Sequence, residues 1–253
     1  MDVHLLPAFK DNYIYLVHDP LKHINIVVDP GDSDVVKMFL SDRQWDLHAI
    51  LITHHHWDHI DGVEELQNSF KCQVIGSVYD QSRLPPLTQR VQGGDCLEIG
   101  SASIQVLFVP GHTTGHIAYY FSDQQWLFVG DTLFSMGCGR IFEGTPEMLF
   151  NSLQQLLLLP DSGKVFCTHE YTLTNAKFAL QFEPNNPDLL LRIKQAEALR
   201  ANHQPTLPTT IMQEKATNPF LRLKSPAIRQ SLNMATATDL EVFTRLRELR
   251  NQF

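Results

Sequence analysis

The sequence has no long hydrophobic segment. Its longest apolar runs, such as Ile24–Val28 and Leu156–Leu159, are far shorter than the roughly 20 residues that cross a bilayer. Met1–Pro7 lacks the basic start, apolar stretch and small-residue cleavage site of an export signal. We therefore expect a cytoplasmic protein without a membrane partner.

An excess of positive charge is also absent. The formal net charge is −8, and a protein that binds nucleic acid needs a basic face to neutralise phosphates. Nucleic acid is therefore excluded as the main partner. A small anionic molecule needs only a few local cations, so the acidic balance leaves that kind of ligand open. We expect a monomer that acts on a small molecule.

Cysteine is scarce, and the motifs of covalent catalysis are missing. The four cysteines form neither a C-x-x-C pair nor a dense framework, which fits a reducing compartment. There is no G-x-S-x-G turn and no recognisable cysteine–histidine motif. The sequence therefore offers no serine or cysteine nucleophile.

What is present is a globular composition, with 43% hydrophobic and 19% charged residues. The first two thirds alternate short apolar runs with helical patterns, which predicts a layered α/β arrangement. The expected strands are Tyr13–Val17, Ile24–Asp29, Leu47–Thr53, Gln73–Gly76, Ser103–Phe108, Ile117–Phe121, Trp126–Val129 and Lys164–Thr168. The expected helices are Ser33–Ser41, Gly62–Phe70 and Thr145–Leu158, the last with proline in its first turn.

The character of the chain changes after about Thr168. Leu189–Asn202 and Asp239–Arg250 have the composition of helices, and the Pro- and Thr-rich stretch Gln204–Thr210 lies between them. We therefore predict a catalytic domain over residues 1–168 and a small α-helical domain over residues 169–253 that binds substrate.

The decisive motif follows the strand Leu47–Thr53 and reads Thr-His-His-His-Trp-Asp-His. Alternate residues of an extended segment face the same side, so His54 and His56 can bind one metal ion. The chain then turns toward the next helix, so that Asp58 and His59 can face a second ion. Imidazole and carboxylate groups are ligands of zinc, and also of iron and manganese.

Three other strand ends supply further candidate ligands. His112, Asp131 and His169 each stand just past an apolar strand, where α/β sheets gather functional groups. A single residue of this kind is more often a loop or capping residue than a ligand. Four such strand ends in one chain favour a metal site.

Two metal ions about 3.5–4 Å apart can share a water molecule and acidify it toward neutral pH. The resulting metal-bridging hydroxide is then the nucleophile, and one ion can polarise a substrate carbonyl. Hydrolysis by this route needs neither a serine nor a cysteine.

The motifs HxHxDH, GHT, GDT and THE, in this order, resemble the metallo-β-lactamase superfamily. The resemblance implies an αββα sandwich over roughly Met1 to His169. It also implies His54, His56 and His112 on one metal, with Asp58, His59 and His169 on the other and Asp131 bridging both. His55 lies outside this pattern, so we expect a packing or solvent role. For His116 we weigh a role in orienting a ligand against that of a plain buried histidine.

A narrower resemblance covers essentially the whole chain. The segments Thr53–His59, Gly130–Phe134, Gly137–Arg140, Thr168–Thr172 and Arg247–Phe253 are similar to the glyoxalase II family. This likeness implies a binuclear thioester hydrolase that converts S-D-lactoylglutathione to D-lactate and glutathione. It assigns Asp58 and Asp131 to catalysis and implies two divalent ions. We expect zinc, with iron and manganese as alternatives.

The family's glutathione contacts map onto Arg140, Phe142, Tyr171, Arg247 and Arg250. Cations suit this substrate because glutathione carries two carboxylates. Spacing alone favours a different interpretation, in which Arg247 and Arg250 are solvated side chains near a helix C-terminus, where cations are favoured. The resemblance to glyoxalase II favours a role in binding glutathione instead. Many relatives have Lys in place of Arg140 and Tyr in place of Phe142, and some have Lys in place of Arg250, which puts substrate affinity in question.

The main alternative is a persulfide dioxygenase with one iron on the same scaffold. Such a protein should lack the terminal Arg-x-x-Arg-Asn-Gln-Phe segment that this chain has. His56 argues against di-iron oxygen reductases, which have Glu at that position. A nuclease would need a basic surface. A non-catalytic metal-binding protein is disfavoured by the complete ligand set.

Overall fold

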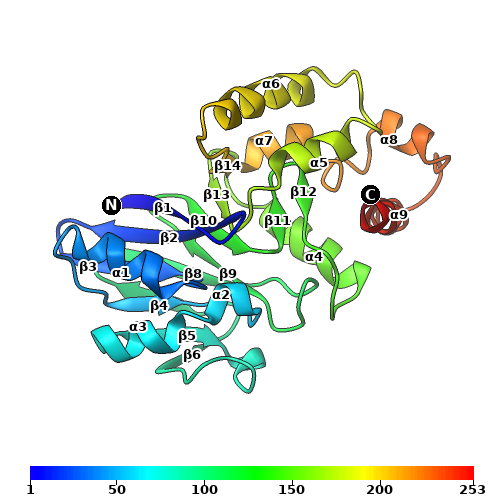
Figure 1. The fold of residues 1–253 in the computed structure, drawn as a ribbon. Helices are drawn as coiled ribbons and strands as arrows, with labels where there is room; N and C mark the ends of the chain where they lie inside the picture. The colour runs from blue at the N-terminus through cyan, green and yellow to red at the C-terminus, as the bar shows by residue number, and fades with distance from the viewer. The chain divides into compact units, whose positions relative to one another are not determined.

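The structure is a computed structural model that describes all residues from Met1 to Phe253 (Figure 1). The chain forms two compact units. Unit 1 comprises residues 1–108 and 114–130, and unit 2 comprises residues 109–113 and 131–253. None of the helices combines the length and apolarity needed to cross a membrane.

Unit 1 begins with a six-stranded sheet in the order β1-β2-β3-β4-β5-β6. The first three strands are antiparallel, and β3 to β6 run parallel. The strands are β1 (Asp2–Ala8), β2 (Asn12–Asp19), β3 (Ile24–Val28), β4 (Ala49–Leu51), β5 (Gln73–Ser77) and β6 (Gln89–Val91). The segment that leaves the end of β4 carries the predicted metal ligands of this unit.

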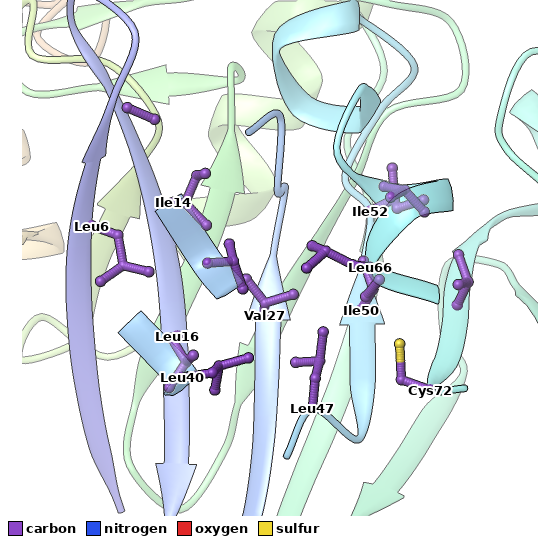
Figure 2. Close-up of a cluster of buried hydrophobic side chains, with 14 residues drawn as sticks. Leu6, Ile14, Leu16, Val27, Leu40, Leu47, Ile50, Ile52, Leu66 and Cys72 are labelled. Carbon is purple, nitrogen blue, oxygen red and sulfur yellow. The ribbon is translucent and has the colours of Figure 1, made fainter. Parts of the chain in front are cut away.

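Two helices bury their apolar sides on one face of this sheet. In α1 (Ser33–Ser41), Val36 and Leu40 are fully buried, as is Leu66 in α3 (Val63–Phe70). Figure 2 shows these leucines packed with strand residues such as Val27. Burial of one such side chain is worth about 1.5–3 kcal/mol, so this cluster is a main source of stability for the unit.

The rest of unit 1 is an antiparallel run of four strands, β7 to β10. Their bounds are Cys96–Ile99, Ala102–Phe108, Ile117–Phe121 and Trp126–Gly130. The buried Tyr119 of β9 donates its hydroxyl to the carbonyl oxygens of Ile52, at 3.0 Å, and Ile75, at 3.2 Å. Because Ile75 lies in β5 and Ile52 directly follows β4, this contact joins the two sheets. Two short helical turns, α2 (Trp57–Ile60) and η1 (Val78–Asp80), complete the unit.

Unit 2 is mostly helical. It contains the hairpin β11 (Leu133–Phe134) and β12 (Gly137–Cys138) and the antiparallel pair β13 (Lys164–Cys167) and β14 (Thr209–Thr210). The helices are α4 (Pro146–Leu156), α5 (Thr172–Ala179), α6 (Pro187–Ala201), α7 (Ile211–Thr217), α8 (Pro226–Ser231) and α9 (Asp239–Gln252). The Phe150 and Phe243 rings, 5.8 Å apart, pack α4 against α9.

Every strand and helix predicted from the sequence is present, and α1 has the predicted bounds. The helix expected from Leu189 begins two residues earlier, at Pro187, because the side chain of Asn186 caps its first turn. The short strands β1, β6, β7 and β14 and the helices α5, α7 and α8 were not predicted. These elements are only two to eight residues long, and most lack enough turns to display an apolar period.

Candidate metal centre

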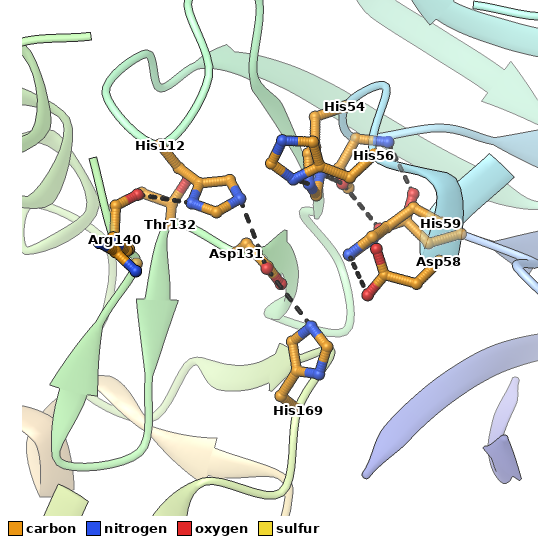
Figure 3. A network of polar contacts seen from close by, with 12 residues as sticks. His54, His56, Asp58, His59, His112, Asp131, Thr132, Arg140 and His169 are labelled. Atoms are coloured by element: carbon orange, nitrogen blue, oxygen red, sulfur yellow. Dashed lines mark hydrogen bonds and ion pairs between the residues drawn. The ribbon is translucent and has the colours of Figure 1, made fainter. Parts of the chain in front are cut away.

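Two imidazoles face each other in the segment that follows β4 (Figure 3). Nε2 of the buried His54 lies 3.1 Å from Nδ1 of His56. Nδ1 of His54 lies 3.0 Å from the Thr53 hydroxyl, which leaves Nε2 as the metal-facing atom of this ring. Zinc binds imidazole nitrogen at about 2.0–2.1 Å, so two tetrahedral ligands stand about 3.3 Å apart. The two nitrogens therefore fit one shared ion.

Asp29, which directly follows β3, ties both ends of this segment together. Its Oδ1 accepts the backbone N–H of Thr53 at 2.7 Å, and its Oδ2 accepts the Thr53 hydroxyl at 2.7 Å. The same Oδ2 lies 3.0 Å from Nδ1 of the fully buried His59. A carboxylate on one ring nitrogen leaves the other as the metal-binding atom and fixes the ring orientation.

Asp58 is held from a different strand. Asn12, at the start of β2, is buried and donates its side-chain N–H to Oδ2 of Asp58 at 2.9 Å. Asp58 lies in the first turn of α2, where the backbone N–H groups also favour a negative charge. The carboxylate is therefore held in one orientation, as a metal ligand requires.

His55, for which the sequence predicted a packing or solvent role, makes a polar contact instead. Its Nδ1 lies 3.1 Å from Oδ2 of Asp80, a carboxylate that is fully buried. Asp80 also accepts a hydrogen bond from Arg83, which reaches the Thr114 hydroxyl at 3.3 Å. A separate contact involves the buried His116, whose ring stacks on His54 with centroids 4.5 Å apart. His116 therefore packs against a predicted ligand.

In unit 2, Asp131 lies between two imidazoles (Figure 3). Its Oδ2 is 3.5 Å from Nε2 of His112 and 3.3 Å from Nε2 of His169. Nδ1 of His112 donates to the backbone carbonyl of Arg140 at 2.7 Å, so Nε2 is the nitrogen of that ring suited to bind a metal. The His169 ring stacks on Tyr171 with centroids 4.7 Å apart. A carboxylate approached by two imidazoles in this way is suited to bridge two ions.

The donor atoms of the two units are nitrogen and oxygen, and most are buried. Their chemistry fits zinc, iron or manganese and fits neither a soft thiolate site nor an all-oxygen site of the calcium type. In His54, His59 and His112 one ring nitrogen is already used by a hydrogen bond, so the other is directed toward a metal. The residues present therefore fit a divalent cation site.

Arg140 and Phe142, two of the predicted glutathione contacts, are exposed in the segment after β12. The Arg140 guanidinium lies 5.4 Å from the centroid of the Phe142 ring. The backbone N–H of Phe142 donates to the His112 carbonyl at 3.1 Å, so this segment is fastened directly to a predicted ligand.

The two predicted arginines of α9 lie in a less exposed position than expected. Arg247 is only 6% exposed and donates to the carbonyls of Cys138, at 2.8 Å, and Gly139, at 3.2 Å. Arg250 lies 3.2 Å from Oδ1 of Asn175 in α5. Burial, and then the neighbouring charge of Arg247, lower the pKa of the Arg250 guanidinium. An anion placed beside these two cations would offset their repulsion.

The hairpin β11–β12 is clamped by α7. Glu214 is fully buried and accepts the backbone N–H of Met136 at 2.8 Å. Met136 stands at the hairpin turn with a φ of +57°, a conformation that favours glycine. Asn218, which caps the C-terminal end of α7, donates to the carbonyls of Phe134, at 3.2 Å, and Gly137, at 2.8 Å. The segment between Asp131 and Arg140 is therefore held by side chains that follow it by about 80 residues.

All four cysteines are free thiols, and three of them are buried. Burial raises the pKa of Cys72 to about 11 and also raises the pKa values of Cys138 and Cys167, although Arg247 opposes the effect at Cys138. A buried, protonated thiol is a poor nucleophile. Cys96, on β7, is the exposed one.

Sequence reasoning missed four residues that support the site: Asn12, Asp29, Asp80 and Glu214. Asp29 carried a weak signal, because it ends an apolar strand just as Asp131 does. The other three stand in segments without a motif, and only the folded chain brings them to the residues that they hold.

Two family models match adjoining parts of the chain. A model described as metallo-beta-lactamase superfamily matches residues 9–169. A model described as hydroxyacylglutathione hydrolase C-terminus matches residues 170–253. Together these matches leave only the first eight residues unmatched.

Individual relatives extend over the full chain. A hydroxyacylglutathione hydrolase from Synechococcus sp. (strain JA-2-3B'a(2-13)) is 47% identical over 254 residues, covering 100% of this chain and of that relative. A hydroxyacylglutathione hydrolase from Jannaschia sp. (strain CCS1) is 44% identical and covers 98% of this chain and 97% of that relative. The crystal structure of ETHE1 from Myxococcus xanthus matches 98% of this chain and 90% of that one, with a TM-score of 0.70 and 25% identity.

Proposed function

The chain belongs to the hydroxyacylglutathione hydrolase family of the metallo-β-lactamase superfamily, and from this membership we propose that it hydrolyses S-D-lactoylglutathione to D-lactate and glutathione. The observation that carries the proposal is Asp131, whose Oδ2 lies within 3.5 Å of two imidazole nitrogens in the unit that includes the hydroxyacylglutathione hydrolase C-terminal segment.

The proposed ligand set follows the family pattern. His54, His56 and His112 would hold one divalent ion, and Asp58, His59 and His169 the other, with Asp131 binding both. Support comes from the hydrogen bonds that orient the rings of His54, His59 and His112. When bound, two such ions lower the pKa of a shared water and polarise the thioester carbonyl.

The protein's own residues then have defined tasks. Asp58, held by Asn12, and Asp131 supply carboxylate groups at the reacting centre, and we assign both to catalysis. Asp29 and the Arg140 carbonyl accept ring protons and so fix the tautomers of His59 and His112. A thiolate is a good leaving group, so no side chain has to act as a strong general acid.

We propose that Arg140, Phe142, Tyr171, Arg247 and Arg250 bind the glutathione moiety. The support is the placement of positive charge in an otherwise acidic protein, because burial and then the neighbouring charge of Arg247 lower the pKa of Arg250. Residues 1–168 would thus act as the catalytic domain and residues 169–253 as the substrate-binding domain.

Zinc is the proposed metal, because the donors are imidazoles and carboxylates in a mostly buried setting. Iron and manganese tolerate the same donors.

We further propose a cytoplasmic monomer. The free state of all four cysteines favours a reducing compartment.

The test combines metal analysis with turnover on the purified protein. We expect two divalent ions per chain and hydrolysis of S-D-lactoylglutathione that strong chelation abolishes and added zinc restores. A metal-loaded protein that leaves this thioester intact would refute the proposal. Release of sulfite from glutathione persulfide would instead identify the dioxygenase alternative.

A further inference from the structure

Two exposed aromatic rings lie in contact beside Asp58. Phe9 stands in the turn between β1 and β2, and Trp57 is the first residue of α2. Their ring centroids are 5.2 Å apart in an edge-to-face arrangement. Phe9 is 48% exposed and Trp57 is 60% exposed, so neither ring belongs to the core. Contacting apolar side chains left in water commonly mark a surface that binds a ligand.

The turn that carries Phe9 is fastened to the metal-ligand segment. Asn12, three residues after Phe9, donates to Oδ2 of Asp58 at 2.9 Å. Phe9 itself has a φ of +50°, which is rare for a bulky residue and persists only where the surroundings hold it. Any side chain on Gly31 would overlap the Asp58 carbonyl and would lie 3.0 Å from the Phe9 ring. The turn that carries Phe9 is therefore linked to Asp58 through Asn12, and Gly31 leaves no room for a side chain between the Asp58 carbonyl and the Phe9 ring.

The chemistry of the pair indicates what it binds. Two aromatic rings offer dispersion contacts and an apolar surface, and they suit an uncharged group. A thioester carbonyl carbon carries two substituents, the sulfur of glutathione and the acyl chain. Glutathione carries two carboxylates, which suit cations, whereas the acyl chain bears no charge. The acyl chain is therefore the substituent whose chemistry matches two aromatic rings beside Asp58.

We propose that Phe9 and Trp57 form a wall that contacts the acyl chain of the substrate and sets the preference among acyl groups. This inference rests on the proposed thioester hydrolysis. It adds the residues that contact the acyl group of the substrate. The wall favours larger apolar acyl chains over small polar ones, because only the former cover both rings.

The experiment compares two substrates that differ only in the acyl side chain. S-D-lactoylglutathione has a methyl group where S-D-mandeloylglutathione has a phenyl ring. The variants are Phe9→Ala and Trp57→Ala, with Trp57→Phe as the conservative change. Leu158→Ala is the control, because Leu158 is 86% exposed and belongs to unit 2, outside the proposed wall. Metal content and melting temperature are measured for each protein.

We expect both alanine variants to lower the ratio of mandeloyl to lactoyl kcat/KM about tenfold, chiefly through KM for the mandeloyl substrate. Trp57→Phe should keep most of the ratio, and Leu158→Ala should leave both substrates unaffected. Phe9 is not adjacent to a ligand in the sequence, so Phe9→Ala tests the wall even if Trp57→Ala loses metal. A ratio unchanged in metal-loaded Phe9→Ala would overturn the inference. A metal-loaded wild-type protein inactive on both thioesters would refute the proposed function itself.

Discussion

Oδ2 of Asp80 lies 3.1 Å from Nδ1 of His55, and this contact fastens the middle of the His54–His59 segment to a fully buried carboxylate. His55 is not a proposed ligand, yet both of its neighbours in the sequence are. A shift of this residue would therefore move His54 and His56 together.

We expect Asp80→Asn to fold and to weaken metal binding about 10–100-fold, as is typical when a partner that orients a ligand is lost. Metal content after dialysis against graded chelator measures this effect. Asp123→Asn is the matched control because Asp123 is exposed in the turn before β10. Wild-type metal retention by Asp80→Asn would mean that the segment keeps its shape without the buried carboxylate.

Asp131→Ala should lose at least one metal ion and reduce kcat/KM more than about 100-fold, because no other proposed ligand binds both ions. Atomic absorption and thioester turnover provide the two readouts. His54→Ala and His169→Ala address the two ions separately, and each should lower the metal content. Two retained ions with near-normal turnover in Asp131→Ala would contradict the ligand assignment.

The two arginines of α9 should respond differently to substitution. Arg247→Ala leaves two carbonyl groups of the Cys138–Gly139 segment without a donor, so we expect a loss of about 2–4 kcal/mol of unfolding free energy in urea. Arg250→Ala should retain stability better and raise KM for S-D-lactoylglutathione about tenfold or more, since a charge-assisted contact is worth about 1.5–3 kcal/mol.

A small thioester without carboxylates separates these two effects. Its hydrolysis should be indifferent to Arg250→Ala, because it has no anion for the guanidinium to bind. Arg245→Ala is the control on the same helix, since Arg245 is paired with Glu248 in an exposed position. Equal losses of kcat/KM on both substrates would show that Arg250 stabilises the fold and does not bind glutathione.

Glu183 should make stability depend on pH in the acid range. Burial raises the pKa of this carboxyl, but hydrogen bonds from Arg222 and Ser225 outweigh burial, so the pKa is lowered overall. An acid with a lowered folded-state pKa stabilises the fold above its unfolded pKa, and this contribution disappears as pH falls through the folded value.

Glu183→Gln should therefore cost about 2 kcal/mol at pH 7 and progressively less below about pH 4.5. Urea unfolding from pH 7 to pH 3 measures the difference from wild type. Glu197→Gln, at an exposed position of α6, should show no such trend. A constant difference across the whole range would argue that the effect of Glu183 is steric.

The metal segment was the part of the site that the sequence could predict. His54, His56, Asp58 and His59 stand within six residues of one another, so local geometry alone brings them near each other. The strand ends of His112, Asp131 and His169 were recognisable because each follows a continuous apolar run.

The supporting residues could not be predicted, because their partners are distant in sequence. Asn12 reaches Asp58 across 46 residues and Glu214 reaches Met136 across 78 residues. Neither residue type nor spacing identifies such a pair before the chain is folded. For the same reason Arg247, which was expected at the rim, was not recognised as a residue that holds the Cys138–Gly139 backbone.

The burial of three of the four thiols also bears on how the proposed enzyme tolerates its own product. Each turnover would release glutathione, whose oxidised disulfide form exchanges with accessible protein thiolates. Cys138 lies close to the residues proposed to bind that product, but burial keeps its sulfur protonated and enclosed. We therefore expect mixed disulfides with oxidised glutathione only at Cys96, on β7. The three buried thiols should stay unmodified when the cellular ratio of oxidised to reduced glutathione changes.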